Sequence, residues 1–272
     1  YYQRLLAGDR NEAIVVVDDY VRERGTEKVY DEVLLPALLS ARRDRHQHAL
    51  SADEETFILD TTRDVLRKLH RVRDVVPGAA PANHSPGIAA NSAAANATDG
   101  NSHEGWHPQS IIKPNAEIAV IGCPAHHPAE EISLEMLAQL LAHGDHYVEI
   151  ISSRVLPSEV EARIADVQPA VVFIAIMPPG GLEQARYLCK RIRKLAKHAK
   201  IVVGYWGELH SSYDKLLVRM RAAGASYLTT SLVQSKSQIA SLLPTRVSAS
   251  QPESEPPQEP APTGLASTAG GG

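Results

Sequence analysis

The sequence lacks several features that would indicate a function by themselves. It contains only two cysteines, Cys123 and Cys189, and neither belongs to a CxxC pair, so no zinc or redox motif is present. We expect Cys189 to be a small core residue of a helix. No apolar run approaches the roughly 20 residues that a helix needs to span a bilayer. The chain begins at Tyr1 with neither an initiator methionine nor a signal-like segment, and we therefore expect it to be part of a longer or processed protein.

An excess of positive charge is also missing. The 28 Lys and Arg residues are outnumbered by 32 Asp and Glu, which gives a formal net charge of -4. Nothing in this balance calls for nucleic acid or an anionic membrane as a partner. Basic residues do cluster at 190–194 and at Lys197, but their spacing wraps around a predicted helix. This spacing favours a solvated face over a phosphate-binding patch.

Motifs for catalysis are absent as well. The sequence has no GxSxG motif, and Gly122-Cys123-Pro124 after the first predicted strand does not continue as the GxGxxG of a dinucleotide site. The run Pro178-Pro179-Gly180-Gly181 lacks the Lys and Ser/Thr of a P-loop, and its prolines remove two amide donors. We expect this run to position the start of a helix rigidly. The sequence therefore predicts a protein that is not an enzyme, and a small-molecule enzyme using a pair of histidines is the weakest alternative.

Residues 1–75 are helical in pattern. Asp9 is a suitable N-cap for a helix over 11–24, and the run 51–54 (Ser-Ala-Asp-Glu) is a capping box that opens another helix. Between them Thr26 caps a third helix, in which the internal Pro36 predicts a kink. Together with a short helix at 3–6, these signals predict a small bundle of about four helices.

Two segments have compositions that do not support a packed core. Residues 76–114 are rich in Pro, Gly, Ala, Asn and Ser, and they predict a flexible linker. Residues 244–272 are low-complexity Pro, Ser, Glu, Ala and Gly, and they predict a disordered tail. These segments divide the chain into a helical domain at 1–75 and a second domain at 115–243.

Strand and helix patterns alternate through the second domain. Its strands are continuous apolar runs, which are typical of a parallel sheet covered on both faces, and we expect them at 117–122, 147–151, 170–176, 200–204 and 226–229. The helices that follow them are expected at 128–142, 157–166, 181–197, 212–223 and 233–243. Five such units predict the α/β class, with a flavodoxin-like doubly wound five-stranded parallel sheet in the order 2-1-3-4-5.

Ligands of a doubly wound sheet collect beyond the carboxyl ends of its strands, at the switch point between the first and third strands. His126 and His127 lie in the loop after the first strand. Adjacent histidines without a third ligand nearby in sequence are a weak metal signal, and we expect both to lie in a solvated loop. Glu130 and Glu131 fit the first turn of the following helix, where the helix dipole favours carboxylates.

A helical segment followed by a doubly wound domain resembles the corrinoid (cobalamin)-binding modules of methyltransferases, methionine synthase and B12-dependent photoreceptor regulators. The resemblance covers most of residues 27–242, and residues 32–38 (Glu-Val-Leu-Leu-Pro-Ala-Leu) are similar to the start of the helical cap in that superfamily. It implies a DxHxxG loop after the first strand, whose His coordinates cobalt. By position, His127 takes the place of this metal ligand.

Other positions that the resemblance makes important carry different residues in this chain. The Asp that orients the second nitrogen of the ligand His is Ala125, and the Gly of the loop is Glu130. The Glu-His pair of the helical cap falls near Glu55-Thr56, without its His. The loop and the cap therefore keep the positions of the motif and lose the partners that orient the ligand.

The strand ends depart from the cobalamin-binding pattern in the same way. The SxL element after the third strand falls at 175–177, where Ala175 and Met177 replace its first and last residues and the hydroxyl for the nucleotide tail is lost. The Gly-Gly after the fourth strand becomes Gly204-Tyr205, followed by Trp206. We expect the two aromatic rings to crowd the slot of the dimethylbenzimidazole tail. Together with His126, these residues predict a degenerate crevice with weak or absent cobalamin binding.

A closer similarity is to the cytosolic C-terminal region of bacterial permeases of the autoinducer-2 exporter family. It rests on residues 2–9, 29–38, 43–46, 185–191 and 202–207. In those permeases a B12-domain-like module trails a membrane transport domain. The resemblance implies an N-terminal transmembrane permease domain as a partner in cis, and a position on the cytoplasmic side of the inner membrane.

Two functions are therefore expected from the sequence. The first is a non-catalytic accessory or sensory domain of a membrane transporter, without a cofactor and with self-association through the helical bundle. The alternative is a true corrinoid-binding carrier or B12-dependent regulator, with cobalamin as its cofactor and His127 as the cobalt ligand.

Overall fold

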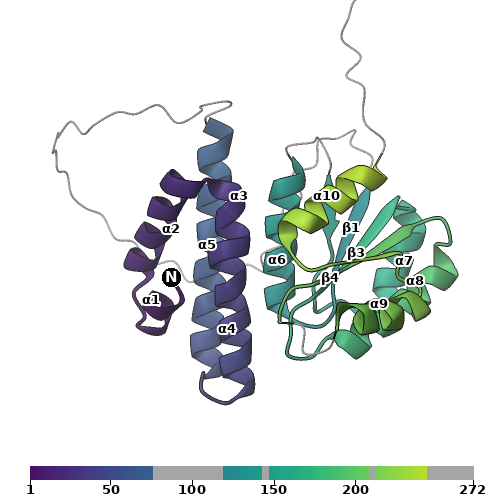
Figure 1. Ribbon diagram of the computed structural model, residues 1–272, viewed down its shortest axis with the longest axis horizontal. Coiled ribbons are helices and arrows are strands. Elements are labelled where there is room, and N and C mark those ends of the chain that lie inside the picture. The colour runs from purple at the N-terminus through teal and green to yellow at the C-terminus, as the bar shows by residue number, and fades with distance from the viewer. Residues whose placement is uncertain (76–118, 143–146, 209–211, 244–272) are drawn as a thin grey trace, which may run out of the picture.

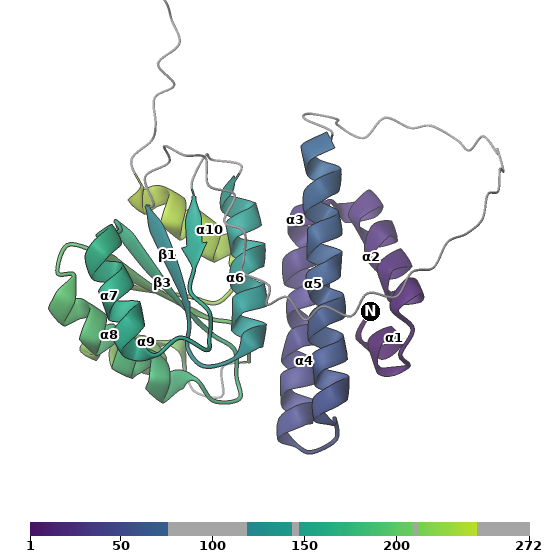
Figure 2. The same cartoon turned by 180° about the vertical axis from the view of Figure 1, so that it is seen from behind.

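The computed structural model describes residues 1–75, 119–142, 147–208 and 212–243. Within these ranges a helical region, residues 1–75, lies beside an α/β domain (Figure 1), and Figure 2 shows the same arrangement from behind. The α/β class and the preceding helical region are as the sequence predicts. The linker expected at 76–114 and the tail expected at 244–272 lie outside the described residues.

The helical region begins and ends its helices close to the predicted capping residues. Its elements are α1 (Tyr2–Leu6), α2 (Arg10–Arg24), α3 (Thr26–Val29), η1 (Tyr30–Leu34), α4 (Leu35–His46) and α5 (Ala52–Val75). Asp9 accepts a hydrogen bond from the Glu12 amide at 2.9 Å and so caps α2. Ser51 and Glu54 bond reciprocally to each other's amides and open α5. Among the helices of the described ranges, none has the length and apolar character to cross a membrane.

The irregularity expected at Pro36 is a π-helical turn. In η1 (Tyr30–Leu34) the backbone hydrogen bonds span five residues instead of four, and the Leu35 amide donates to the Tyr30 carbonyl. Proline has no amide hydrogen, and its ring crowds the carbonyl four residues before it. A wider turn directly before Pro36 accommodates this crowding, so the chain continues from α3 into α4 without a loop.

The five strands form one parallel sheet. They are β1 (Val120–Pro124), β2 (Val148–Ile150), β3 (Val171–Ile176), β4 (Lys200–Tyr205) and β5 (Tyr227–Thr229), in the order β2-β1-β3-β4-β5. This is the predicted flavodoxin-like order, with the switch point between β1 and β3. The register aligns Pro124 with Ala175 and Ala175 with Gly204, so the three strand ends meet at one edge.

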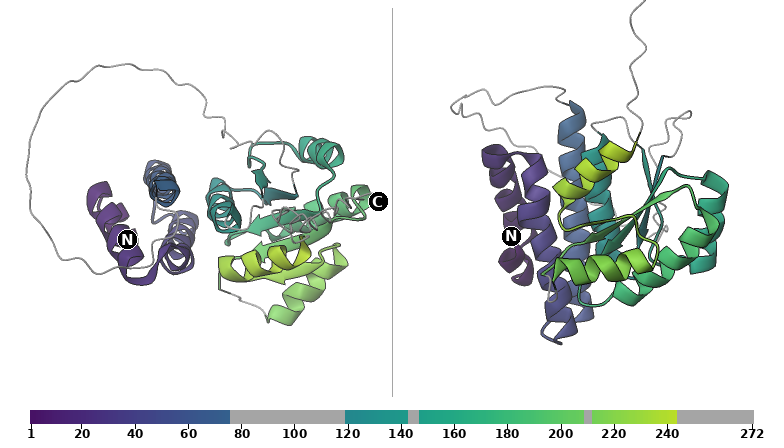
Figure 3. Two further views of the ribbon diagram at one scale, coloured as in Figure 1. Left: turned by 90° about the horizontal axis from the view of Figure 1, so that it is seen from above. Right: turned by 45° about the vertical axis from the view of Figure 1, so that its right-hand side comes forward.

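Helices cover both faces of the sheet, as Figure 3 shows from above. One face carries α6 (Pro128–Leu141) and α10 (Leu232–Leu242). The other face carries α7 (Pro157–Val167), α8 (Leu182–Leu195) and α9 (Tyr213–Ala222). This second face encloses its own apolar core, which includes both cysteines, as the sequence predicts for Cys189.

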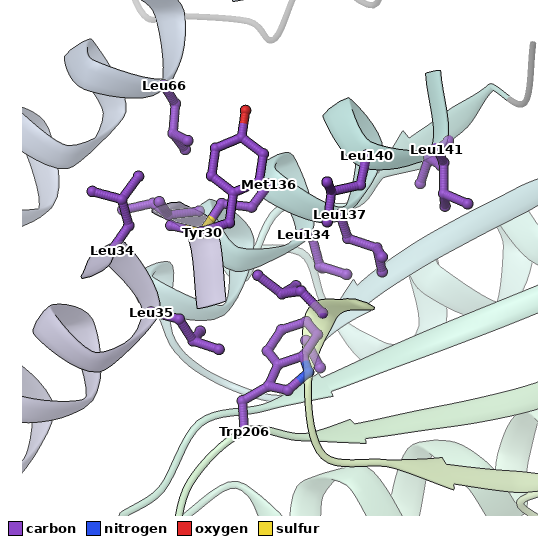
Figure 4. Close-up of a cluster of buried hydrophobic side chains, with 14 of the residues drawn as sticks. Tyr30, Leu34, Leu35, Leu66, Leu134, Met136, Leu137, Leu140, Leu141 and Trp206 are labelled. Carbon is purple, nitrogen blue, oxygen red and sulfur yellow. The ribbon is translucent and has the colours of Figure 1, made fainter. Parts of the chain in front are cut away.

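The first face shares its core with the helical region. Side chains of η1, α4 and α5 pack against side chains of α6 and the loop after β4 in one continuous cluster (Figure 4). The members drawn there include Tyr30, Leu34, Leu35, Leu66, Leu134, Met136, Leu137 and Trp206. A second, smaller cluster lies within the helical bundle around Leu5 and Ile58. Because burial of apolar surface dominates folding free energy, the two regions stabilise each other.

Polar contacts at the rim of the shared core fix how the two regions meet. The Tyr30 hydroxyl donates to Gln139 Oε1 at 2.6 Å. Asp31, on the next position of the π turn, accepts from the amides of Leu232 and Val233 at 2.8 and 3.0 Å and thereby caps α10 from another part of the chain. The π turn thus directs one side chain into the core and its neighbour to a helix terminus.

Truncation of Leu34 tests whether the helical region contributes to one common core. Leu34 has no exposed surface, so Leu34→Ala should lower the free energy of unfolding by about 2–5 kcal/mol. Urea unfolding followed by circular dichroism measures the change. The matched control is Val15→Ala on α2, where the side chain is 53% exposed and the expected change is within about 0.5 kcal/mol. Equal effects of the two substitutions would contradict the shared core.

Candidate functional site

The predicted crevice residues meet at the carboxyl edge of the sheet. Ala125 follows β1, and its amide donates to the Ala175 carbonyl of β3 at 3.0 Å. The Trp206 amide after β4 donates to the Ile176 carbonyl at 3.0 Å. The structure therefore brings together the loops after β1, β3 and β4, which the sequence assigned to one crevice.

Trp206 fills the interior on the α6 side of this edge. Its side chain is fully buried, and its ring stacks on that of Phe173 with centroids 5.6 Å apart. Gly204 makes this stacking possible, because a Cβ at this position would lie 2.6 Å from the Phe173 ring. Within the described residues the indole Nε1 has no hydrogen-bond partner, so apolar packing holds the ring in place.

Tyr205 does not crowd the same space, which corrects the sequence-based expectation of two rings in one slot. Its side chain is partly exposed and packs on the opposite core, beneath α7, α8 and α9. The reason is the pleat of the strand, which turns consecutive side chains to opposite faces. Of these two rings, that of Trp206 lies next to Phe173 and that of Tyr205 does not.

The two histidines are not in a solvated loop, which is a second correction. The side chains of His126 and His127 are 25% and 17% exposed, because the helical region covers them. The guanidinium of Arg42 on α4 lies 3.0 Å from His126 Nε2 and donates to the Pro179 carbonyl at 2.8 Å. His127 Nε2 lies 3.4 Å from Glu55 Oε1 on α5. Contacts between distant parts of the sequence thus decide the environment of this loop.

The hydrogen bonds of His127 assign its tautomer. His127 is the N-cap of α6, and its Nδ1 accepts from the Ala129 amide at 3.1 Å. Burial, together with the nearby charge of Arg42, lowers the pKa of His127 to about 4, so the ring is neutral near pH 7. A neutral imidazole that accepts at Nδ1 carries its proton on Nε2.

This tautomer of His127 differs from the one that a cobalt ligand requires. A metal-binding nitrogen must be unprotonated, and the other ring nitrogen then donates its proton to a fixed acceptor. Here Nδ1 is an acceptor, and the position that would carry the orienting Asp is Ala125. In this arrangement the residues present do not fit His127 as a ligand of a corrinoid cobalt.

Glu130 organises the loop more strongly than its position in a first helical turn suggested. Its carboxylate is fully buried and accepts from the amides of His126, His127 and Met177 at 2.7, 2.9 and 3.0 Å. The carboxylate therefore ties the loop after β1 to the loop after β3. A sequence signal existed, because Glu130 is at the third helical position, where it completes a capping box.

Arg42 is the residue of the site that sequence reasoning missed. It is 8% exposed, and burial lowers its pKa while Glu130 and Glu55 oppose this effect. The same burial raises the pKa of Glu55, which Arg42 and Arg45 oppose. No local pattern marks Arg42, since its partners lie 84 and 137 residues further along the chain.

The Pro-Pro-Gly-Gly run places backbone directly against His126. Gly180 and Gly181 have φ values of 89° and 78°, which side chains rarely adopt, and a Cβ on Gly181 would come within 3.0 Å of the His126 ring. Helix α8 begins at the next residue. The run therefore combines a constrained backbone with close packing at the start of a helix.

A cavity of about 350 Å³ opens at the same edge on the other face of the sheet. Its lining comes from the end of β1, the loop between β2 and α7, and the first turns of α7 and α8. Cys123 is part of the lining, and burial raises the pKa of its thiol to about 12, so the thiol is protonated at neutral pH. The volume is in the range of small-molecule sites, and the lining is mostly apolar.

The histidine pair is not part of a larger group of metal-binding side chains within the described residues. In the described ranges no three His, Cys, Asp or Glu residues gather so as to hold a metal ion. The neighbouring rings of His126 and His127 have centroids 6.0 Å apart and are tilted by 56°. The described part of the chain thus offers no protein-only metal centre around the histidine pair.

The α/β domain is similar to proteins of known family. Residues 118–225 match the family model of the B12 binding domain, and this match spans β1 to α9. A crystal structure of a cobalamin-binding protein from Desulfitobacterium hafniense DCB-2 is similar over 89% of this chain and 97% of that chain, with 12% sequence identity and a TM-score of 0.39. No curated protein matches the sequence. The α/β domain, with its flavodoxin-like strand order, is therefore similar to the B12 binding domain over residues 118–225.

Substitution of Glu130 tests its role in tying the loops. Glu130→Gln replaces one oxygen acceptor by an NH2 group that faces amide donors, so it should lower the free energy of unfolding by about 1–3 kcal/mol. The control is Glu159→Gln, at the same capping-box position of α7, where the acceptor is exposed and glutamine serves equally well. Thermal unfolding of both variants measures the difference, and a Glu130→Gln midpoint as high as that of the control would refute the role.

Proposed function

We propose that this chain is a non-catalytic accessory or sensory module, built on the B12-binding fold, that binds cobalamin weakly or not at all. One observation carries the proposal. The helical region packs without a break against α6, the histidine loop and Trp206. By the resemblance to corrinoid modules, this is where the tetrapyrrole and its nucleotide tail would lie.

The free energy of this packing opposes entry of a large ligand. Moving Trp206 aside exposes a fully buried indole, and burying such a side chain contributes about 1.5–3 kcal/mol or more. Loss of its stacking on Phe173 costs about a further 0.5–1.5 kcal/mol. A corrinoid would also have to separate Leu34 and Leu35 from α6. The binding energy of the cofactor would have to exceed these costs.

The chemical state of the site residues supports a role without catalysis. Glu130 is committed to three backbone amides, and the Nδ1 lone pair of His127 is committed to a fourth. The Cys123 thiol is protonated and buried. Glu130, His127 and Cys123 thus already have a structural role or an unreactive state.

A sensory role is supported by the cavity on the α7–α8 face. It lies beyond the carboxyl end of β1, where doubly wound sheets bind small ligands. Helix α8 contributes Gln184 and Tyr187 to its lining, and Tyr187 is 48% exposed. A small effector at this place would contact two helices and a loop, and would leave the shared core intact.

The resemblance to autoinducer-2 exporter permeases suggests the context of the module. In this proposal it follows a transmembrane permease domain in cis and lies on the cytoplasmic side of the inner membrane. Self-association of the helical bundle then brings permeases together. The DNA upstream of the Tyr1 codon tests this part: an open frame encoding several apolar segments of about 20 residues is expected, and a start codon directly before Tyr1 would oppose it.

A true corrinoid carrier or B12-dependent regulator is the alternative function. The family match over residues 118–225 favours it, as does the position of His127 in the loop after β1. It requires that His127 exchange tautomers and leave the Ala129 amide, and that the helical region move off the loop. The two functions therefore differ in whether the helical region stays packed on the histidine loop.

Mixing the purified chain with hydroxocobalamin decides between the two functions. We expect a colourless protein after desalting, because the shared core leaves no room for the corrin and His127 has the wrong tautomer. The absorption spectrum in the visible range measures retained cobalamin. His127→Ala and its matched control His126→Ala should behave like the wild-type chain.

A red protein after desalting would refute weak binding. If the colour is lost in His127→Ala and kept in His126→Ala, the corrinoid carrier becomes the better function. Isothermal titration with hydroxocobalamin gives the affinity in that case, and the control variant separates ligation from general disturbance of the loop.

A further inference from the structure

Positive charge in this acidic protein is concentrated on helices α8 and α9 and the residues between them. Residues 182–222 contain ten of the 28 Lys and Arg and only three of the 32 Asp and Glu. This segment therefore carries an excess of seven positive charges, and the remainder of the chain carries an excess of eleven negative ones. Such an asymmetry points to an anionic partner, although the net charge does not.

Helices α8 and α9 present these charges on a common outer surface. They lie side by side, since Arg219 on α9 pairs with Glu183 on α8 at 3.2 Å, and Arg193 donates to the Gly224 carbonyl after α9 at 3.0 and 2.8 Å. Figures 1 and 2 place this layer on the side of the sheet away from the helical region. We name this outer surface of α8, α9 and the turn to β4 the basic face.

The cations of the basic face fall into two groups. Four arginines have structural partners: Arg186 and Arg219 pair with Glu183, Arg191 pairs with Glu161, and Arg193 bonds to carbonyls. Six further cations are exposed and have no ion pair within the described residues: Lys190, Lys194, Lys197, Lys200, Lys215 and Arg221. The one other exposed acid on the face is Asp214. The helix face is solvated, as the sequence predicts, and six of its positive charges have no paired acid within the described residues.

Apolar side chains are exposed between these cations. Tyr187 and Leu195 on α8 are 48% and 43% exposed, and Val218 on α9 is 66% exposed. Most of the large hydrophobic residues of the α/β domain are buried, so exposed ones within a cationic surface are informative. Lysine chains surround them with flexible aliphatic stems and mobile charges.

We propose that the basic face docks on the surface of an anionic phospholipid bilayer. Five of the six unpaired cations are lysines, which act as flexible point charges and suit the diffuse charge of a lipid surface, whereas a nucleic-acid site favours the planar fork of arginine. Exposed apolar side chains between lysines match the boundary of headgroups and acyl chains. The inference goes beyond the proposed function and does not require it, because none of the six unpaired cations lines the cavity or belongs to the histidine loop or the shared core.

Sedimentation of the full chain with lipid vesicles tests this proposal. At low ionic strength the protein should sediment with vesicles of phosphatidylcholine mixed with phosphatidylglycerol, and not with phosphatidylcholine alone. Binding should fall steeply with added salt, as the screening length shortens from about 10 Å at 0.1 M to about 3 Å at 1 M. Absence of sedimentation with the anionic vesicles at low salt overturns the proposal.

A charge-matched pair of variants locates the binding surface. The triple variant K190Q/K194Q/K197Q should lower the partition coefficient on the order of a hundredfold. The control R24Q/K28Q/R71Q removes three exposed cations of the helical region, none of which has an ion pair within the described residues, and it should bind like the wild type. Equal loss in both variants would show that net charge alone drives binding and would overturn the assignment. Circular dichroism confirms that both variants are folded.

Two further measurements separate lipid docking from other anionic partners. Val218→Ser should weaken vesicle binding without changing its salt dependence, since it removes apolar contact only. Duplex DNA and poly-glutamate serve as alternative anions at the same ionic strength. Tight binding of either through Lys190, Lys194 and Lys197, without binding to the anionic vesicles, would refute a lipid surface as the partner.

Discussion

The continuous apolar core between the helical region and α6 is the constraint on which the rest of the structure depends. Tyr30, Leu34 and Leu66 contribute to it from one side, and Leu134 and Met136 contribute from the other. Burial of these side chains brings α4 and α5 over the carboxyl edge of the sheet. Polar contacts such as those of Arg42 with the loops after β1 and β3 form at the rim of this core and depend on it. The burial of the histidines is a consequence of the same packing.

Polar atoms of the crevice are already used in hydrogen bonds within the protein. The Nδ1 lone pair of His127 caps α6. A metal could bind Nε2 only if the proton moved from Nε2 to Nδ1, which would end this cap. The buried carboxylate of Glu130 joins the loops after β1 and β3 through the amides of His126 and Met177. The α/β domain thus has the flavodoxin-like strand order, and these loop side chains stabilise contacts within the protein.

Sequence patterns predicted the fold well, since the information is local. Continuous apolar runs and capping residues such as Asp9 and Ser51 placed the strands and helices to within a few residues. The site was predicted in part. The sequence predicted correctly which loops meet. It did not predict that successive side chains of a strand point to opposite faces of the sheet here, which separates Tyr205 from Trp206. The environment of His126 was wrong because Arg42, 84 residues earlier, carries no local signal of its partner. Side chains buried between the helical region and the α/β domain depend on contacts between distant residues, which a short sequence pattern cannot predict.

The stacked pair of Phe173 and Trp206 has a consequence for the life of the protein in a cell. A module that folds around a vitamin gains stability in proportion to the logarithm of the vitamin's free concentration, and it is depleted by proteolysis when supply fails. Under the proposed function, a module whose own indole completes its interior has no such dependence. Its steady-state amount then follows synthesis and turnover alone, in nutrient-rich and nutrient-poor conditions alike.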